Sequence, residues 1–357
     1  MGTRSRSKKS TRRTRTRVRT IPTYPYKRTF LDYEALKEKV RAYKPIILTT
    51  NKAYTLTASQ KDLLHLILRK YKNLDRFKSH IYLLITEPSN YYINELTDNY
   101  SEECRIRCRV ESEQYSPYDS YKLFYDEIVN AAGSSNPISI NKYMEHHGYK
   151  SRMCTNYKLT YLLGLMQIFK PRRWLDLSAG WGDRLIAAAL GGVQYYCGID
   201  PNDCLHPCYK KIIEDLVPAD RRSNFQLINA EAQKLSEDFG VTKTFDFIFT
   251  SPPFFTFEEY EGERANREIY GSMDKWLTDF MFKTVDFAWT KLEKGGKYGL
   301  YIEDKPEYRF MDRLLEYISR QKGANYLGII HQCYISNKND GSIHYGIKKV
   351  YFFEKKN

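Results

Sequence analysis

The chain has 357 residues, with 57 Lys and Arg against 43 Asp and Glu, so its formal charge is +14, and 42% of it is hydrophobic. This is enough apolar material for one large or two modest cores, which excludes a wholly disordered protein. The longest apolar stretches, such as 161–169 and 185–190, are far shorter than the roughly 18 to 20 residues that a bilayer span requires. No membrane partner is predicted.

The first 28 residues form a basic tail, with eleven Lys and Arg and no acid, which leaves only +3 for residues 29–357. The tail has no apolar face to fold around and strong self-repulsion, so residues 1–28 are predicted to be disordered, with order beginning near Phe30. Such a tail would bind DNA or RNA by releasing counterions. A solubilising, nuclear-import or organellar-presequence role stays open. The candidate nucleic-acid-binding residues are Arg12, Arg13, Arg15, Arg17 and Arg19.

Seven scattered cysteines and no export signal predict reduced thiols inside the cell. Cys104 and Cys108 share a four-residue step with Cys204 and Cys208, and His206 lies inside the second pair. Zinc usually takes CxxC knuckles, whereas this step merely puts two small side chains on one helix face. No metal site is predicted.

Residues 29–150 read as a mixed α/β region and a candidate for substrate recognition. Apolar spacing predicts helices over 31–42, 58–71 and 121–131. Runs of β-branched and apolar residues predict strands over 81–86 and 105–110.

Residues 151–357 alternate regularly between short apolar runs and helical segments. This alternation predicts an α/β fold with a Rossmann-like, doubly wound, mainly parallel sheet and ligands at the carboxyl ends of its strands. Two last runs, 326–335 and 342–354, are predicted to form an antiparallel hairpin at the sheet edge. The predicted strands are 173–178, 194–199, 225–229, 245–250 and 297–303, and the predicted helices are 183–190, 203–217, 273–292 and 307–321.

A glycine-bearing turn joins the first core strand to its helix, with Asp176 at its start and Gly180 and Gly182 inside it. Glycines at such a junction let the backbone approach a ligand. Neither GxGxxG nor a P-loop motif is present, which disfavours a dinucleotide or NTPase site. Asp200 lies about 20 residues further on, where a carboxylate can bind both ribose hydroxyls. Alone, Asp200 would read as a turn or N-cap residue.

A proline-bearing turn follows the strand 245–250 and consists of Ser251, Pro252, Pro253 and Phe254. The two prolines stiffen it and fix where the Ser251 side chain and the Pro252 carbonyl point. The alternative is an ordinary β-turn. The following segment, 255–272, rich in Glu, is predicted to be a mobile loop over the substrate.

With these two turns, residues 150–335 resemble the class I S-adenosylmethionine-dependent methyltransferases of the N6-adenine/N4-cytosine aminomethyltransferase group. They are most similar to methyltransferase-like proteins of phages and large DNA viruses, so a nucleus, viral factory or virion is the implied location. The resemblance implies S-adenosylmethionine as cofactor and catalysis by Ser251, Pro252, Pro253 and Phe254. The implied cofactor-binding residues are Asp176 at the methionine end, Ser178, Gly180, Gly182, Asp200 at the ribose and Glu231 or its neighbours at the adenine.

Two departures from this group are visible. Ser178 stands where many relatives have Gly, and the cofactor motif precedes the chemical motif, unlike the permuted order common among cytosine-N4 enzymes. Members of the wider group also methylate RNA guanine or a protein glutamine. The implied activity is methylation of an exocyclic amine of a DNA or RNA base. The alternative is a methyltransferase-like structural or nucleic-acid-packaging protein with a vestigial site.

Overall fold

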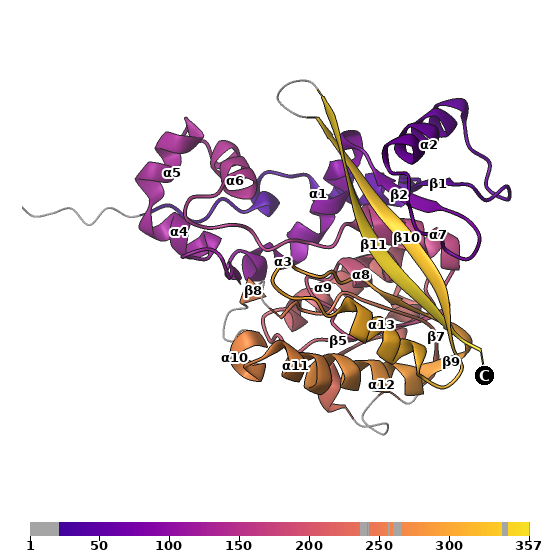
Figure 1. Ribbon diagram of the computed structural model, residues 1–357. Coiled ribbons are helices and arrows are strands. Elements are labelled where there is room, and N and C mark those ends of the chain that lie inside the picture. Colours follow the sequence, from indigo (N-terminus) through magenta and orange to yellow (C-terminus); the bar gives the residue numbers. More distant parts are fainter. Residues whose placement is uncertain are drawn as a thin grey trace, which may run out of the picture.

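The computed structural model describes residues 21–235, 241, 243–255, 258–259, 266–337 and 342–356 (Figure 1). Its described part contains a nine-stranded sheet in the order β1-β2-β10-β11-β9-β7-β4-β5-β6. From one edge to the other, the strands are β1 (Ile46–Thr49), β2 (Tyr82–Thr86), β10 (Ala324–Asn337), β11 (Ile343–Lys355), β9 (Leu292–Leu300), β7 (Phe245–Thr250), β4 (Arg173–Asp176), β5 (Tyr195–Ile199) and β6 (Phe225–Ile228).

The run from β6 to β9 is entirely parallel, which confirms the predicted Rossmann-like α/β architecture. β11 is antiparallel to both of its neighbours, β9 and β10. The two last strands therefore form the predicted hairpin, but its predicted place at the sheet edge is wrong. β2, from the N-terminal region, pairs in parallel with β10 and continues the sheet beyond it.

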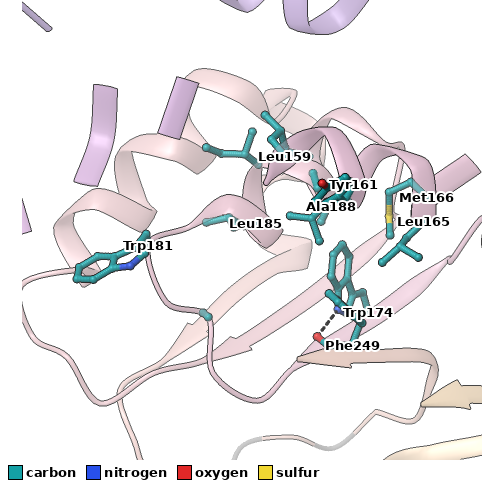
Figure 2. Close-up of a cluster of buried hydrophobic side chains, with 14 of the residues drawn as sticks. Leu159, Tyr161, Leu165, Met166, Trp174, Trp181, Leu185, Ala188 and Phe249 are labelled. Atoms are coloured by element: carbon teal, nitrogen blue, oxygen red, sulfur yellow. Dashed lines mark hydrogen bonds between the residues drawn. The ribbon is translucent and has the colours of Figure 1, made fainter. Parts of the chain in front are cut away.

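Helices cover both faces of the sheet because apolar side chains alternate along its strands. Trp174 and Phe247 point to the face covered by α7 (Leu159–Phe169), α8 (Asp183–Leu190) and α9 (His206–Leu216). Figure 2 shows side chains of α7 and α8 beside Trp174, whose indole donates to the carbonyl of Phe249 at 3.2 Å. Leu175 and Ile248 pack on the opposite face, in one cluster with residues of α12 (Lys283–Lys291) and α13 (Met311–Ser319).

The predicted helix 273–292 is one long segment in three parts. It comprises α11 (Met273–Trp276), the π-helical η5 (Leu277–Phe282) and α12. None of the helices in the described part of the chain has the length and apolarity to cross a membrane.

The N-terminal region contributes β1 and β2 to the sheet and is otherwise largely helical. Its helices α4 (Pro117–Leu123), α5 (Tyr125–Ala132) and α6 (Pro137–His146) gather at one end of the molecule (Figure 1). The predicted strand 105–110 is wrong for most of its length, because α3 (Asp98–Arg105) ends there and only β3 (Arg109–Val110) is extended. β3 pairs with β8 (Glu258–Glu259), so this part of the predicted mobile loop is held against the N-terminal region. The other helices are α1 (Tyr33–Ala42), α2 (Ala58–Lys70) and α10 (Asn266–Tyr270), and the 3-10 helices are η1 (Lys27–Thr29), η2 (Pro88–Thr97), η3 (Ala219–Asn224) and η4 (Ala232–Lys234).

Two disulfide bonds tie the end of α3 to the core, Cys104–Cys204 and Cys108–Cys154. The prediction of reduced thiols is therefore wrong for four of the seven cysteines, while Cys197, Cys208 and Cys333 are free. The four-residue spacing of Cys104 and Cys108 was interpreted as a shared helix face. Their sulfur atoms instead bond to cysteines in two different loops.

The described chain is packed well before Phe30, where order was predicted to begin. Tyr24 is buried against Tyr121, and the Lys27 ammonium binds the buried Asp98 carboxylate at 2.6 Å. Lys27 therefore neutralises an internal acid, which the charge count of the tail did not reveal. The five candidate arginines between Arg12 and Arg19 lie outside the described residues.

Candidate active site

The glycine turn owes its shape to two left-handed residues, Gly180 (φ 57°) and Gly182 (φ 95°). A Cβ atom on Gly182 would come within 2.7 Å of Ile212 Cδ1 on α9. The close approach at Gly182 is therefore made by a helix of the protein itself, whereas a Cβ on Gly180 would meet no atom closer than 3.5 Å. Of the two glycines, only Gly180 lines the cavity described below.

Asp176 ends β4 and holds the turn together from inside. Its carboxylate accepts hydrogen bonds from Arg184 Nε at 2.7 Å and from the Tyr196 hydroxyl at 2.9 Å, and the side chain is fully buried. The backbone N–H of Ser178 also donates to it at 3.3 Å. The Arg184 guanidinium also donates a hydrogen bond to the carbonyl of Ser178. In this arrangement Asp176 and Ser178 shape the turn through Arg184.

Asp200, directly after β5, is hydrogen-bonded to the same turn. Its carboxylate accepts from the backbone N–H groups of Gly180 at 2.7 Å and Asn202 at 3.1 Å. Burial raises the pKa of Asp200 to about 6, although these two donors act to lower it. Asp200 can therefore hold the turn and still bind a ribose hydroxyl, because each carboxylate oxygen has a second lone pair.

Glu231 follows β6, the strand next to β5, and lies beside an unsatisfied polar group. Gln233 donates from Nε2 to Glu231 at 2.5 Å and to the Tyr270 hydroxyl at 3.1 Å. Gln233 Oε1 is buried and accepts no hydrogen bond from the described part of the chain. A buried acceptor without a donor is costly, so an N–H group of a ligand would be stabilised here.

The proline turn directly follows β7, whose last residue is hydrogen-bonded to the neighbouring strand. The carbonyl of Thr250 accepts from the backbone N–H of Tyr301 at 3.1 Å, at the end of the neighbouring strand β9. Pro252 is buried, and Ser251 Oγ makes no hydrogen bond to any described residue. Lys305 Nζ lies 5.6 Å from the centroid of the Phe254 ring.

Both turns line one cavity of about 530 Å³, which we call the acceptor cavity. The glycine turn and the start of α8 contribute Gly180, Trp181, Asp183 and Arg184, and the proline turn contributes all four of its residues. The two turns, which follow the neighbouring parallel strands β4 and β7, therefore meet in one cavity. Asp176, Ser178, Gly182, Asp200 and Glu231 do not line this cavity.

The rest of the lining comes from segments that carry no local motif and that the sequence did not single out. They are the loop before α7 with the first turn of α7, the segment after β9, and the β10–β11 hairpin. Their lining residues are Thr155, Asn156, Tyr157, Lys158, Tyr161, Tyr301, Glu303, Asp304, Lys305, Gln332, Tyr334 and Lys348. Only the sheet order, which places β11 beside β9 and β10 beside β11, brings these segments to the cavity.

Two charged groups in the wall have pKa values shifted by burial. Asp183 accepts from the Thr97 hydroxyl at 2.6 Å, and burial raises its pKa to about 7. Burial lowers the pKa of Lys158, and the nearby Asp183 carboxylate opposes that change. Thr97 belongs to the N-terminal region, so this region contributes to the electrostatics of the cavity.

No protein-family model matches the chain, and no curated protein sequence matches it. Parts of the chain are similar to solved structures. TrmN from Thermus thermophilus is 17% identical with a TM-score of 0.37, over 56% of this chain and 49% of that one, so the match spans about half of its length. The N-methyltransferase NodS from Bradyrhizobium japonicum is 12% identical with a TM-score of 0.36, over 56% and 94%. A precorrin-6y C5,15-methyltransferase from Geobacter metallireducens is 11% identical with a TM-score of 0.37, over 55% and 88%.

Proposed function

We propose that the protein is an S-adenosylmethionine-dependent N-methyltransferase that acts on an exocyclic amino group of a nucleobase in DNA or RNA. The observation that carries this proposal is the single cavity between the glycine turn and the proline turn. It lies at the carboxyl ends of β4 and β7, the edge at which α/β sheets bind ligands.

The residues along this edge fit the cofactor. Gly180 leaves space beside its backbone, Asp200 follows β5 for the ribose, and Glu231 follows β6 for the adenine amine, next to Gln233 Oε1, which has no partner among the described residues. Asp176 would act indirectly, by holding Arg184 and the turn. When bound, S-adenosylmethionine supplies a methyl group on a sulfonium.

The proline turn would hold the amine that receives the methyl group. An amine conjugated to a ring is a weak nucleophile, because its lone pair is delocalised. Ser251 Oγ and the Pro252 carbonyl would accept its two N–H bonds and so favour a pyramidal nitrogen. Positioning and fixed dipoles would supply most of the rate. Phe254 would stack on the target ring, and a base in a duplex would first have to flip out.

The basic tail would supply polyanion affinity without sequence choice. Deleting residues 1–20 removes nine of the eleven Lys and Arg of the tail. We expect weaker binding to a 30-nucleotide single strand and a smaller dependence of binding on salt, measured by fluorescence anisotropy between 50 and 200 mM salt. Equal salt slopes for the two proteins would contradict this role.

The proposed activity is tested by nucleoside mass spectrometry after incubation of the protein with mixed DNA and RNA and isotopically labelled S-adenosylmethionine. We expect one labelled methylated base. Ser251→Ala should lower the rate by roughly 10²-fold or more, as for removal of other preorganised polar groups, while calorimetry shows unchanged cofactor binding. Ser319→Ala, on the exposed side of α13, is the matched control. Cofactor binding without labelling of any nucleic acid would favour the structural alternative.

A further inference from the structure

Tyr157 and Gln332 meet in the wall of the acceptor cavity although 175 residues separate them. Tyr157 precedes α7, and its ring packs edge-on against Phe249 at 5.6 Å and Tyr301 at 5.0 Å. Those two residues flank the proline turn, since Phe249 lies two positions before Ser251 and Tyr301 is bonded to Thr250. The pair therefore stands beside the groups proposed to hold the amine.

The strand pairing fixes Gln332 in place. In β10 it is paired with Leu84 of β2 on one side and Lys348 of β11 on the other, and its side chain is only 2% exposed. Lys348 lines the same cavity and is itself held by Glu303 at 2.6 Å. A polar amide in this position has little freedom to turn away.

The hydrogen bond between the two side chains leaves both donors and acceptors unused. Gln332 Nε2 donates one of its two N–H bonds to the Tyr157 hydroxyl, and within the described part of the chain the second N–H, Gln332 Oε1 and the Tyr157 O–H have no partner. If the amide is turned over, Tyr157 donates to Oε1 and the unused groups become both amide N–H bonds and the phenol oxygen. In both orientations the pair offers at least one donor next to one acceptor.

This pattern complements an amine that lies next to an unprotonated ring nitrogen. Adenine has this pattern at N6 and N1, and cytosine has it at N4 and N3. The Watson–Crick edge of guanine instead carries two neighbouring donors, N1–H and N2–H. Matched hydrogen bonds to a polar edge discriminate strongly, because a mismatched edge leaves buried polar groups unpaired.

We propose that Tyr157 and Gln332 read the aminated edge of the target base and select adenine or cytosine over guanine. The proline turn would accept both amine N–H bonds, the acceptor of the Tyr157–Gln332 pair would share the N–H on the side of the ring nitrogen in a bifurcated hydrogen bond, and the donor of the pair would bind the ring nitrogen. This inference rests on the proposed function and adds the acceptor class to it.

The test compares a base with its analogue that lacks the ring nitrogen, within one single-stranded oligonucleotide. Adenine is compared with 1-deazaadenine, or cytosine with 3-deazacytosine, according to the base that the natural protein methylates. The natural protein should prefer the intact base in kcat/KM by about 10-fold or more, because the pair's donor loses its partner in the analogue. Tyr157→Phe or Gln332→Glu, whichever removes the donor, should reduce that preference to near unity. A merely structural role for the pair would change both substrates alike.

A matched pair elsewhere serves as the control. Tyr195 donates to Gln226 at 2.8 Å across β5 and β6, away from the acceptor cavity. Tyr195→Phe and Gln226→Glu should leave the preference between base and analogue unchanged. Melting temperatures of all four variants identify any that fail to fold. Tyr157→Phe keeps the ring and its packing, so it preserves the test if Gln332→Glu unfolds.

The possible failures are distinguishable. If the natural protein labels no nucleic acid, or labels only a protein glutamine, the proposed function itself fails. If it labels only the N2 amine of guanine, the function stands and the role of the pair is overturned. The same conclusion follows if it labels adenine or cytosine and both variants keep the natural preference.

Discussion

Two cavities of similar size lie at opposite edges of the same sheet, and they differ in how their polar groups are used. The acceptor cavity, of about 530 Å³, lies at the carboxyl ends of β4 and β7. The second, of about 600 Å³, lies at the amino end of β7, where Asp246 and Phe247 line it. Its wall combines the aromatic rings of Tyr54, Phe77, Tyr82 and Phe169 with polar residues such as Asn51, Asp246 and Lys297.

The inner polar groups of this amino-edge cavity are engaged in holding the fold. The Asp246 carboxylate accepts from the backbone N–H groups of Arg172 and Arg173 at 3.0 and 2.8 Å. Asn51 donates to the Tyr82 hydroxyl at 2.7 Å, and Lys297 binds Glu354 at 2.7 Å.

The acceptor cavity, in contrast, keeps hydrogen-bonding atoms unused. Ser251 Oγ, Gln332 Oε1 and the buried Asn156 Oδ1 have no hydrogen-bond partner in the described part of the chain. Unpaired polar atoms are costly unless a ligand satisfies them. Buried polar atoms without a hydrogen-bond partner in the described part of the chain, and not volume, therefore distinguish the candidate site.

The sharpest way to break this comparison is to remove one ring from each cavity. Phe254→Ala should lower methyl transfer by roughly 10²-fold or more, because the target ring loses its stacking surface and its position. Tyr54→Ala, in the amino-edge cavity, should leave the transfer rate within about 2-fold of the natural protein, because transfer depends on positioning at the other cavity. Equal losses in a labelling assay would show that the distinction between the cavities is wrong.

The disulfide bonds set the acceptor cavity apart in a second way. Cys154 directly precedes Thr155 in the cavity wall, and Cys204 follows the loop of Asp200. Cys108→Ser with Cys154→Ser should lower the free energy of unfolding by about 2–4 kcal/mol in urea titrations, because the unfolded chain gains freedom. Cofactor affinity should also fall. Dithiothreitol should destabilise the natural protein but not a variant lacking all four bonded cysteines. An unchanged unfolding midpoint in dithiothreitol would contradict this account.

Two glycines allow the cost of backbone strain to be measured apart from the cost of a steric clash in the glycine turn. Gly182 and Gly192 both have left-handed φ angles, 95° and 79°, but a Cβ on Gly192 would have no heavy atom within 4 Å. Gly182→Ala should therefore cost about 1–3 kcal/mol more than Gly192→Ala, from the clash with Ile212. Thermal unfolding of the two variants checks this, and equal costs would mean that α9 yields without strain.

The smallest expected effect is a change in pH dependence. The pKa of Asp183 is raised to about 7 by burial, above the value near 3.9 of an unfolded aspartate. Between about pH 4 and 7 the folded state thus holds more protons than the unfolded state, so stability falls as pH rises through this window. Asp183→Asn should flatten that fall by the order of 1 kcal/mol in urea titrations at pH 4.5 and 7. Asp220→Asn, at an exposed position, should leave that fall unchanged. An identical fall of stability with pH in the natural protein and both variants would be evidence against a raised pKa of Asp183.

The core of the fold was predictable because each of its strands and helices has a pattern of apolar residues that is visible within one short segment. Runs such as Phe245–Thr250 alternate with helices of ordinary length, and this alternation alone implies a parallel sheet. The position of the hairpin was not predictable, because it depends on β2 pairing with β10 across more than 240 residues. Neither strand has a sequence feature that indicates which strand it pairs with.

The two turns of the site were predictable from glycine and proline, whose backbone restrictions act within a few residues. The walls of the acceptor cavity were not. Tyr157 and Gln332 are unremarkable in the sequence, and only the sheet order places them together. The disulfides were missed because cysteine spacing gives no distance between loops.

The most direct test of the central claim maps where the cofactor binds. The protein is irradiated with S-adenosylmethionine that carries tritium in its methyl group, and the labelled peptides are identified by mass spectrometry. We expect label in peptides that contain residues 180–184 or 251–254, and competition by unlabelled cofactor. Label confined to residues 77–82 at the amino-edge cavity, or no label that unlabelled cofactor displaces, would contradict it.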